Sequence, residues 1–357
     1  MINVTQTFLP PLEEYSEILK QVWESKWLTN RGELVRELES KLCNYLGVEN
    51  ILAVSNGTLA LQIAIKALGL KGEIITTPFS YVATVSSIVW ENCTPVFVDI
   101  DAEHLTIDET KIEAAITSKT CAILATHVYG NPCNVEAIDE IAGRHNLKVI
   151  YDAAHCFGVK YKGESILNWG DVSTLSFHAT KLFHTGEGGA IVCRDKGLNQ
   201  SIFNHHNFGH NGPEEFFGLG INGKLSELNA AMGLTVLPYI DEVIANRKAV
   251  CDVYDKALAG RIIQTINLRE GTKWNFSYYP VIFQSETIMH KAVAGLSEAE
   301  IFPRRYFYPS LNRLPYVEYS EMPVAEDLSS RTICLPLSAA MNLVDAEMIV
   351  SLILQYD

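Results

Sequence analysis

Residues 148–155 read Lys-Val-Ile-Tyr-Asp-Ala-Ala-His, and this stretch decides the fold class. Its apolar run is a short strand pattern that closes on a carboxylate, Asp152. A carboxylate at the end of a buried strand costs free energy unless a cation or hydrogen bonds compensate its charge. The stretch therefore predicts a buried parallel strand that ends on Asp152, which either meets a cationic ligand or closes a local turn.

Similar β-branched runs lie on both sides of this stretch and alternate with helical patterns. Near-continuous apolar strands separated by helices are typical of a mostly parallel sheet covered on both faces. The sequence therefore predicts an α/β fold with a seven-stranded sheet and with ligands at the carboxyl ends of its strands. We expect strands at 51–54, 73–77, 95–99, 121–126, 148–152, 172–176 and 189–193, and helices at 58–68, 80–90, 108–116 and 135–146.

The segments outside this core divide the chain. Two helices joined by the polar segment 27–32, which we expect to reach over a site, precede the sheet, and a long helix interrupted at Pro238 follows it. We predict an N-terminal segment plus large domain at 1–240 and a smaller α+β domain at 241–357. The additional helices are expected at 13–23, 33–46, 224–258, 286–294 and 345–355, and a strand at 277–283.

The composition excludes several classes of protein. The chain has 357 residues and a formal net charge of -14, which disfavours binding to nucleic acid or to anionic membranes. It begins without a signal-peptide pattern, and we expect no membrane span because no 18-residue apolar run stands out. Its eight cysteines form no C-x-x-C pair, which predicts reduced thiols in a cytoplasmic protein.

Ser55-Asn56-Gly57-Thr58 lies between a strand and an apolar helix. The first N–H groups of such a helix attract anions, and a glycine lets an anion approach the backbone closely. The segment therefore fits a phosphate seat, although an ordinary helix cap has the same residue types. It matches neither the dinucleotide-binding nor the P-loop glycine pattern.

Lys181 ends the segment Ser176-Phe177-His178-Ala179-Thr180-Lys181, between two apolar strands. Desolvation and a nearby cationic cofactor would lower the pKa of Lys181 toward that of an amine able to form a Schiff base. The alternative is an ordinary surface lysine in a loop.

These three features follow one another at strand ends of one sheet. Together they predict a pyridoxal-phosphate (PLP) site, in which the helix N-terminus binds the phosphate, Asp152 keeps the pyridine nitrogen protonated and Lys181 binds the aldehyde. Tyr81, after another strand, could stack on the ring or pack in the core. His155 could contact a ring substituent or be a core histidine.

The residues resemble the DegT/DnrJ/EryC1/StrS sugar aminotransferases, which have PLP fold type I. This resemblance implies a homodimer with active sites completed across the interface. The matching segments are 55–61, 78–84, 151–155, 176–181, 188–190, 220–227, 306–309 and 335–337.

The resemblance also implies a role for each site residue. Gly57, Thr58 and Ser176 would hold the phosphate, while Tyr81 stacks on the ring, Asp152 pairs with the pyridine nitrogen, His155 lies by the ring hydroxyl, Lys181 is catalytic and Asn222 reaches the partner's cofactor phosphate. The chain departs from the family at Lys224, where many relatives carry arginine, and at Pro309-Ser310-Leu311, where they carry Pro-Leu-His.

The implied substrates are L-glutamate and a keto-sugar nucleotide, with Tyr308 and His178 as substrate contacts. Arg304 and Arg305 suit the diphosphate because a planar guanidinium matches phosphate oxygens, and the alternative is a solvated basic pair. The segments 8–15 and 27–32 resemble enzymes that aminate C4 of dTDP-4-keto-6-deoxyglucose for bacterial O-antigen. Alternatives are C3 amination of a dTDP-sugar, GDP-perosamine synthesis, and a non-catalytic PLP-binding regulatory protein. We expect no metal site, and we expect His205, His206 and His210 to line a loop at the sugar end of the site.

Overall fold

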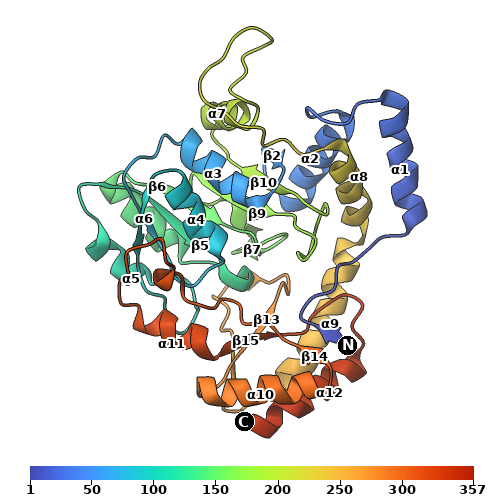
Figure 1. Cartoon of the computed structure of the whole chain (residues 1–357), viewed down its shortest axis with the longest axis vertical. Helices are drawn as coiled ribbons and strands as arrows, with labels where there is room; N and C mark the ends of the chain where they lie inside the picture. Colours follow the sequence, from blue (N-terminus) through green and yellow to red (C-terminus); the bar gives the residue numbers. More distant parts are fainter.

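A seven-stranded sheet forms the centre of the computed structural model, which describes residues 1–357 (Figure 1). Six strands run parallel, and β10 runs antiparallel between β2 and β9. The predicted strands are confirmed, with ends shifted by at most two residues. The spatial order is β2 (Ile51–Val54), β10 (Gly189–Val192), β9 (Val172–Ser176), β6 (Lys148–Asp152), β5 (Thr120–Thr126), β3 (Glu73–Thr76) and β4 (Thr94–Phe97).

Helices cover both faces of this sheet. Successive side chains of a strand point to opposite faces, so each face carries apolar side chains that helices bury in a cluster of their own. Leu52 and Val54 of β2 face α3, whereas Ile51 and Ala53 face α2. This arrangement leaves only the strand ends open for a ligand. One face packs against α3 (Gly57–Ala67), α4 (Val82–Trp90) and α7 (Lys196–His206), and the other against α2 (Glu33–Leu46), α6 (Val135–His145) and α8 (Glu227–Val236).

The long helix predicted at 224–258 is two helices. Helix α8 ends at Val236, a 3-10 turn contains Pro238, and α9 spans Ile240–Leu258. An 18-residue window of this helical stretch has a mean hydropathy of 1.2, which is enough for a membrane span, and half of that window is buried inside the protein. The apolar side of α8 packs against α2 and α1 (Leu12–Ser25).

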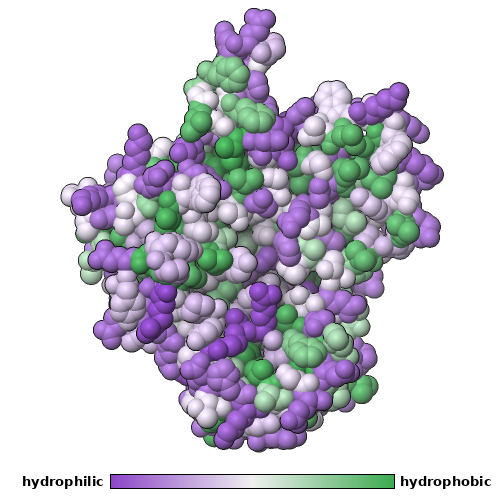
Figure 2. Space-filling model, viewed as in Figure 1, coloured by the Kyte–Doolittle hydropathy of each residue, from purple (hydrophilic) through white to green (hydrophobic).

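A loop projects from the body of the molecule after α7 (Figure 1). Hydrophobic groups gather on this projection in the space-filling view (Figure 2). Phe216, Phe217 and Leu219 are each more than 60% exposed, although apolar side chains of this size usually pack in a core or an interface. We call residues 207–221 the projecting loop.

A second apolar cluster lies in the C-terminal part of the chain. The antiparallel sheet β11-β13-β15 packs with α9, α10 and α12. The predicted boundary near residue 240 stays a prediction, and strand β1 pairs across it with β14. The elements are β1 (Ile2–Asn3), β11 (Gln264–Thr265), β13 (Tyr279–Ile282), β14 (Ile301–Phe302), β15 (Thr332–Leu335), α10 (Glu286–Glu298) and α12 (Leu343–Ile353).

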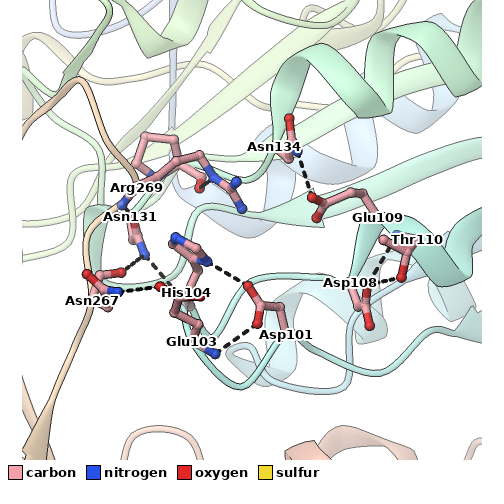
Figure 3. Close-up of polar contacts among 11 residues, drawn as sticks. Asp101, Glu103, His104, Asp108, Glu109, Thr110, Asn131, Asn134, Asn267 and Arg269 are labelled. Atoms are coloured by element: carbon pink, nitrogen blue, oxygen red, sulfur yellow. Dashed lines mark hydrogen bonds and ion pairs between the residues drawn. The ribbon is translucent and has the colours of Figure 1, made fainter.

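Polar contacts tie the C-terminal segments to the loops at the edge of the central sheet (Figure 3). Asn131 Nδ2 donates to the carbonyls of His104 and Asn267, and Asn131 Oδ1 accepts the N–H of Arg269. The carboxylate of Asp99 accepts the first N–H groups of α11 (Pro323–Arg331), which satisfies a helix N-terminus. The two parts of the chain are thereby held in a fixed relation at the strand ends.

The remaining elements are short. The predicted helix at 108–116 is an α-turn followed by a 3-10 turn. β7, β8 and β12 form a small sheet of their own, in the order β12-β7-β8. These elements are α5 (Glu109–Ile112), β7 (Lys160–Tyr161), β8 (Glu164–Ser165) and β12 (Thr272–Lys273).

Candidate active site

One pocket opens at the carboxyl ends of the central strands. Residues after β2, β3, β6 and β9 converge there because parallel strands end at the same edge of a sheet. Residues from the C-terminal part close its other side. Of the residues predicted from the sequence, the pocket is lined by Gly57, Thr58, Tyr81, Asp152, His155, Ser176, His178, Lys181 and Arg304.

The first turn of α3 forms an anion seat. Asn56 caps the helix by accepting the Leu59 N–H at 2.8 Å, as the capping interpretation expects. The N–H groups of Gly57 and Thr58 have no intrahelical acceptor, so they remain available to a ligand. Ser176 lies beside them, since a Cβ on Gly57 would be 3.0 Å from the Cβ of Ser176. Capping and anion binding therefore use different groups of the same turn.

Gly189 lets three backbone segments meet at this seat. It pairs with Val54 on one side and with Ser176 on the other. A Cβ on Gly189 would lie 2.6 Å from the carbonyl carbon of Asn56 and 2.8 Å from the nitrogen of Gly57. The seat can form only where residue 189 has no side chain.

Gly189→Ala is therefore expected to displace the anion seat. We expect a loss of about 1–3 kcal/mol in the free energy of unfolding from overpacking. We also expect cofactor binding to weaken about 10- to 100-fold as backbone hydrogen bonds to the anion lengthen. Thermal unfolding and PLP titration measure both. The matched control is Gly143→Ala, in a helix with nothing near its Cβ position; equal PLP affinity of the two variants would contradict the prediction.

Asp152 is 5% exposed and makes two hydrogen bonds within the protein. Its Oδ1 accepts the Ala154 N–H at 3.1 Å, which is the local turn considered from the sequence, and its Oδ2 accepts the Thr84 hydroxyl at 2.7 Å. Burial raises the pKa of Asp152, whereas these bonds and the charge of Lys181 lower it. A protonated heterocycle is the cation that such a carboxylate lacks.

Lys181 projects into the same pocket. Burial lowers the pKa of Lys181, although the charge of Asp152 raises it. Its Nζ lies 5.7 Å from the centre of the Tyr278 ring. Lys181 forms no ion pair within the protein, so its amine is free to react.

His155 has a defined tautomer. Its Nδ1 accepts the Tyr129 N–H at 3.1 Å, and burial lowers the pKa of His155 well below its ordinary value. A neutral ring whose Nδ1 accepts must carry its proton on Nε2. The ring is parallel to that of Phe307 at 5.7 Å, which fixes its plane. His155 is therefore a neutral donor at the pocket and is more than a core histidine.

Aromatic and charged side chains complete the pocket. Tyr81 precedes α4 and is 52% exposed, so the core-packing alternative for its ring is wrong. Its ring lies 6.5 Å from Phe307. The guanidinium of Arg304 lies 4.8 Å from the Tyr306 ring. His178 Nε2 lies 3.6 Å from a carboxylate oxygen of Glu187.

Three predicted residues do not line this pocket, namely Arg305, Tyr308 and Asn222. Arg305 donates to Glu286 and to the carbonyl of Ser330, and its guanidinium stacks 3.5 Å from the ring of Tyr308. Asn222 is exposed and pairs with Asn207 at the base of the projecting loop. Their predicted roles in substrate and cofactor binding stay predictions.

The prediction that His205, His206 and His210 line a loop at the site is wrong. His205 and His206 are the last residues of α7, where their rings bond to backbone carbonyls of their own helix. His210 is in the projecting loop, and none of the three lines the pocket. The segment 27–32 also lies outside it, and Arg31 there pairs with Glu39 at 2.8 Å.

Sequence reasoning missed several pocket residues, including Ser80, Thr126, Tyr306 and Phe307. Small hydroxyl residues are too common to stand out in a sequence. Tyr306 and Phe307 approach the site only through the packing of the C-terminal part. Thr84, which supports Asp152 from outside the pocket lining, was missed as well, although it follows Tyr81 by one helical turn.

Comparison with known proteins agrees with this geometry. The model of the DegT/DnrJ/EryC1/StrS aminotransferase family matches residues 12–354. The chain belongs to this family. A dTDP-4-amino-4,6-dideoxy-D-glucose transaminase of Shigella dysenteriae is 45% identical over 99% of this chain and 98% of that protein. A GDP-perosamine synthase of Escherichia coli O157:H7 is 34% identical over 90% of this chain and 89% of that protein.

Among solved structures, that of DesI in the presence of its TDP-sugar product has a TM-score of 0.94 and 32% identity. The match covers 99% of this chain and 93% of DesI. The predicted PLP fold type I is therefore confirmed, and this member of the DegT/DnrJ/EryC1/StrS family is a PLP-dependent sugar aminotransferase.

The residues present fit PLP. The pocket combines a helix N-terminus for the phosphate, a buried carboxylate for a pyridinium, and an unpaired lysine for the aldehyde. These are the three chemical groups that PLP presents, and they come from three different strand ends.

Proposed function

We propose that the protein transfers the amino group of L-glutamate to C4 of dTDP-4-keto-6-deoxy-D-glucose and releases dTDP-4-amino-4,6-dideoxy-D-glucose. The single observation that carries this proposal is the pocket with an unpaired Lys181 opposite a buried Asp152. The Shigella dysenteriae relative supports the choice of sugar and carbon. We infer a role in bacterial surface polysaccharide, in the cytoplasm, where its eight free thiols would stay reduced.

We assign the proton transfer to Lys181. PLP, when bound, supplies an electron sink that stabilises negative charge at the amino-acid Cα. The Nζ of Lys181 takes the proton from Cα of the amino donor and delivers it to the neighbouring cofactor carbon, C4′. For the sugar, the same amine works in the opposite direction and protonates C4. A lowered pKa suits this task because the amine must both accept and return a proton near neutral pH.

The other pocket residues orient the reactants. With PLP bound, Asp152 would compensate the charge of the pyridine nitrogen, and His155 would donate through Nε2 to the ring hydroxyl. Tyr81 would stack on the face of the cofactor ring. Arg304 is the pocket's one guanidinium, and it suits the diphosphate of the nucleotide because its planar fork matches two phosphate oxygens.

A visible absorption spectrum of the purified protein with PLP tests the reaction and its substrate. L-glutamate should bleach the band of the bound cofactor, and the correct keto-sugar nucleotide should restore it. Recovery with dTDP-4-keto-6-deoxyglucose supports the proposal. Recovery only with GDP-4-keto-6-deoxymannose or with a 3-keto sugar would contradict the proposed substrate and identify the other sugar in its place. If no amino acid bleaches the band, the protein is better explained as a PLP-binding regulatory protein.

The projecting loop supports a homodimer. Its exposed phenylalanines need a covering surface, and a second copy of the chain provides one by two-fold symmetry. Asn222 and Lys224 lie at the base of this loop and do not line the pocket: Lys224 pairs with Val54, the last residue of the strand before the anion seat, and Asn222 pairs with Asn207. We infer that Asn222 reaches the cofactor phosphate of the partner subunit.

Mixing two inactive variants tests this shared site. Lys181→Ala and Asn222→Ala dimers should each lose activity, whereas a mixed dimer has one site with both native residues. Random re-association should restore about one quarter of wild-type activity, because half of the dimers are mixed and each has one intact site. No recovery, with mixed dimers verified by affinity tags, would show that Asn222 acts within its own subunit.

A further inference from the structure

A chain of three buried hydroxyl groups leads to Asp152. Thr84 Oγ1 lies 2.7 Å from Asp152 Oδ2, and Ser80 Oγ lies 2.8 Å from Thr84 Oγ1 and 2.9 Å from Thr126 Oγ1. All four side chains are at most 5% exposed. They come from α4, from the loop before it, and from the ends of β5 and β6.

The ionised carboxylate fixes the direction of every bond in this chain. A carboxylate only accepts, so Thr84 must donate its single hydroxyl proton to Asp152. Thr84 can then only accept from Ser80, and Ser80 can only accept from Thr126. Each hydroxyl donates once, and all three dipoles point their positive ends toward Asp152, which stabilises its charge.

The opposite direction is disfavoured. If Oδ2 of Asp152 carried the proton and donated to Thr84, Thr84 would donate to Ser80 and Ser80 to Thr126. The hydroxyl proton of Thr126 would then have no acceptor within the protein, because Ser80 is the only protein group bonded to Thr126 Oγ1. A buried donor without an acceptor costs free energy, so the chain keeps Oδ2 unprotonated. The Thr84 hydroxyl also bonds more strongly to a charged carboxylate oxygen than to a neutral carboxyl oxygen, which favours the ionised form.

We propose that Thr84, supported by Ser80 and Thr126, is a positioning residue that keeps Asp152 ionised and holds its carboxylate toward the pyridine nitrogen of the cofactor. This inference rests on the proposed function. Without Thr84, only the Ala154 N–H would remain as a hydrogen bond to the buried carboxylate, and the proton shared with the pyridine would move toward Asp152. A neutral pyridine is a weaker electron sink.

Other charged or titratable groups near Asp152 do not replace this hydroxyl. Lys181 interacts with Asp152 electrostatically, but its amine is the group that binds the cofactor aldehyde. His155 is a neutral donor. The remaining groups lining the pocket are Tyr81, His178, Glu187, Arg304 and Tyr306. Cys156 also lies near Asp152, and its thiol is neutral because burial raises its pKa.

The test compares Thr84→Val, Thr84→Ser and a control in the protein bound to PLP labelled with ¹⁵N in its ring. The ¹⁵N chemical shift reports whether the pyridine nitrogen is protonated, in the absence of any substrate. We expect a pyridinium shift in the wild type and in Thr84→Ser, and a movement toward neutral pyridine in Thr84→Val. The reaction with L-glutamate should slow about 10- to 100-fold in Thr84→Val, as for a lost hydrogen bond to a charged group.

Thr76→Val is the matched control, because Thr76 is equally buried and its hydroxyl has no partner. It should match the wild type in both measurements. Ser80→Ala removes the donor to Thr84, so it should move the ¹⁵N shift in the same direction by a smaller amount. This variant tests the proposal even if Thr84→Val fails to fold.

A pyridinium shift in Thr84→Val together with a wild-type rate would overturn the proposal. So would a Thr84→Ser variant that behaves like Thr84→Val, since the hydroxyl would then not be the cause. A failure of the proposed function looks different: the wild type would show a pyridinium shift and yet aminate no keto-sugar nucleotide.

Discussion

Lys181→Ala is expected to slow the reaction with L-glutamate by about 10²- to 10⁴-fold, since it removes the group that moves the proton and binds the cofactor aldehyde. The variant should still bind PLP, because the anion seat and Asp152 come from other strand ends. Stopped-flow absorbance with L-glutamate measures the rate. Thermal unfolding should be little changed, because Lys181 makes no ion pair whose loss would destabilise the fold.

Two further lysine variants make this result specific. Lys181→Arg keeps the positive charge but cannot act as base or amine nucleophile, so it should be as slow as Lys181→Ala. Lys148→Ala removes an exposed lysine from β6 that pairs with Asp171 at 2.9 Å, and it should react like the wild type. A Lys181→Arg variant that reacts within tenfold of wild type would contradict the assigned role.

Asp152→Asn is expected to slow the same reaction about 200- to 5,000-fold, from the roughly 3–5 kcal/mol that loss of one partner of a buried charge pair costs. Asparagine has the shape of aspartate and can still accept the Ala154 N–H. The loss would therefore come from the missing charge opposite the pyridine nitrogen. Single-turnover rates and the ¹⁵N shift of labelled PLP measure it; a wild-type rate with a pyridinium shift would contradict it.

The same substitution should stabilise the cofactor-free protein at pH 7. Burial raises the pKa of Asp152 in the folded state, so folding with the ionised carboxylate is costly above that pKa. The cost disappears as the pH falls toward about 4, where the carboxyl of the unfolded chain also binds a proton. We therefore expect a higher Tm for apo Asp152→Asn at pH 7 and a shrinking difference at lower pH. A lower Tm at pH 7 would contradict this.

The higher stability expected of apo Asp152→Asn and its loss of activity have the same cause, the buried charge of Asp152. Thr84 and Ala154 each contribute one hydrogen bond to Asp152, which does not replace full hydration of a carboxylate. The fold therefore accepts an unfavourable buried charge that a bound pyridinium would compensate. Binding of PLP should raise the Tm of the wild type more than that of Asp152→Asn.

The local sequence pattern was sufficient to predict much of the fold and several residues of the pocket. The seven central strands were predictable because short apolar runs between helical periodicities specify buried parallel strands. The helix predicted at 58–68 begins at Gly57, where Asn56 provides a cap that is visible in the sequence. The pocket residues after β2, β6 and β9 were predictable since the ends of parallel strands lie at one edge.

Long-range packing decided the rest. Thr84 donates to Asp152 across 68 positions of sequence, a pairing that no local spacing encodes. The stack of Phe307 on His155 also depends on how the C-terminal part packs against the strand ends. Arg304 and Arg305 are neighbours in sequence, and only the tertiary structure turns one into the pocket and the other toward Glu286.

The sequence by itself therefore determined the sheet, the order of its strand-end residues and the chemistry of Lys181 and Asp152, because these follow from hydrophobic period and from the cost of buried charge. Only the tertiary structure decided which hydroxyls surround Asp152, which tautomer His155 adopts and which arginine faces the pocket. Those properties depend on directional hydrogen bonds between residues far apart in the chain, which a one-dimensional pattern does not specify.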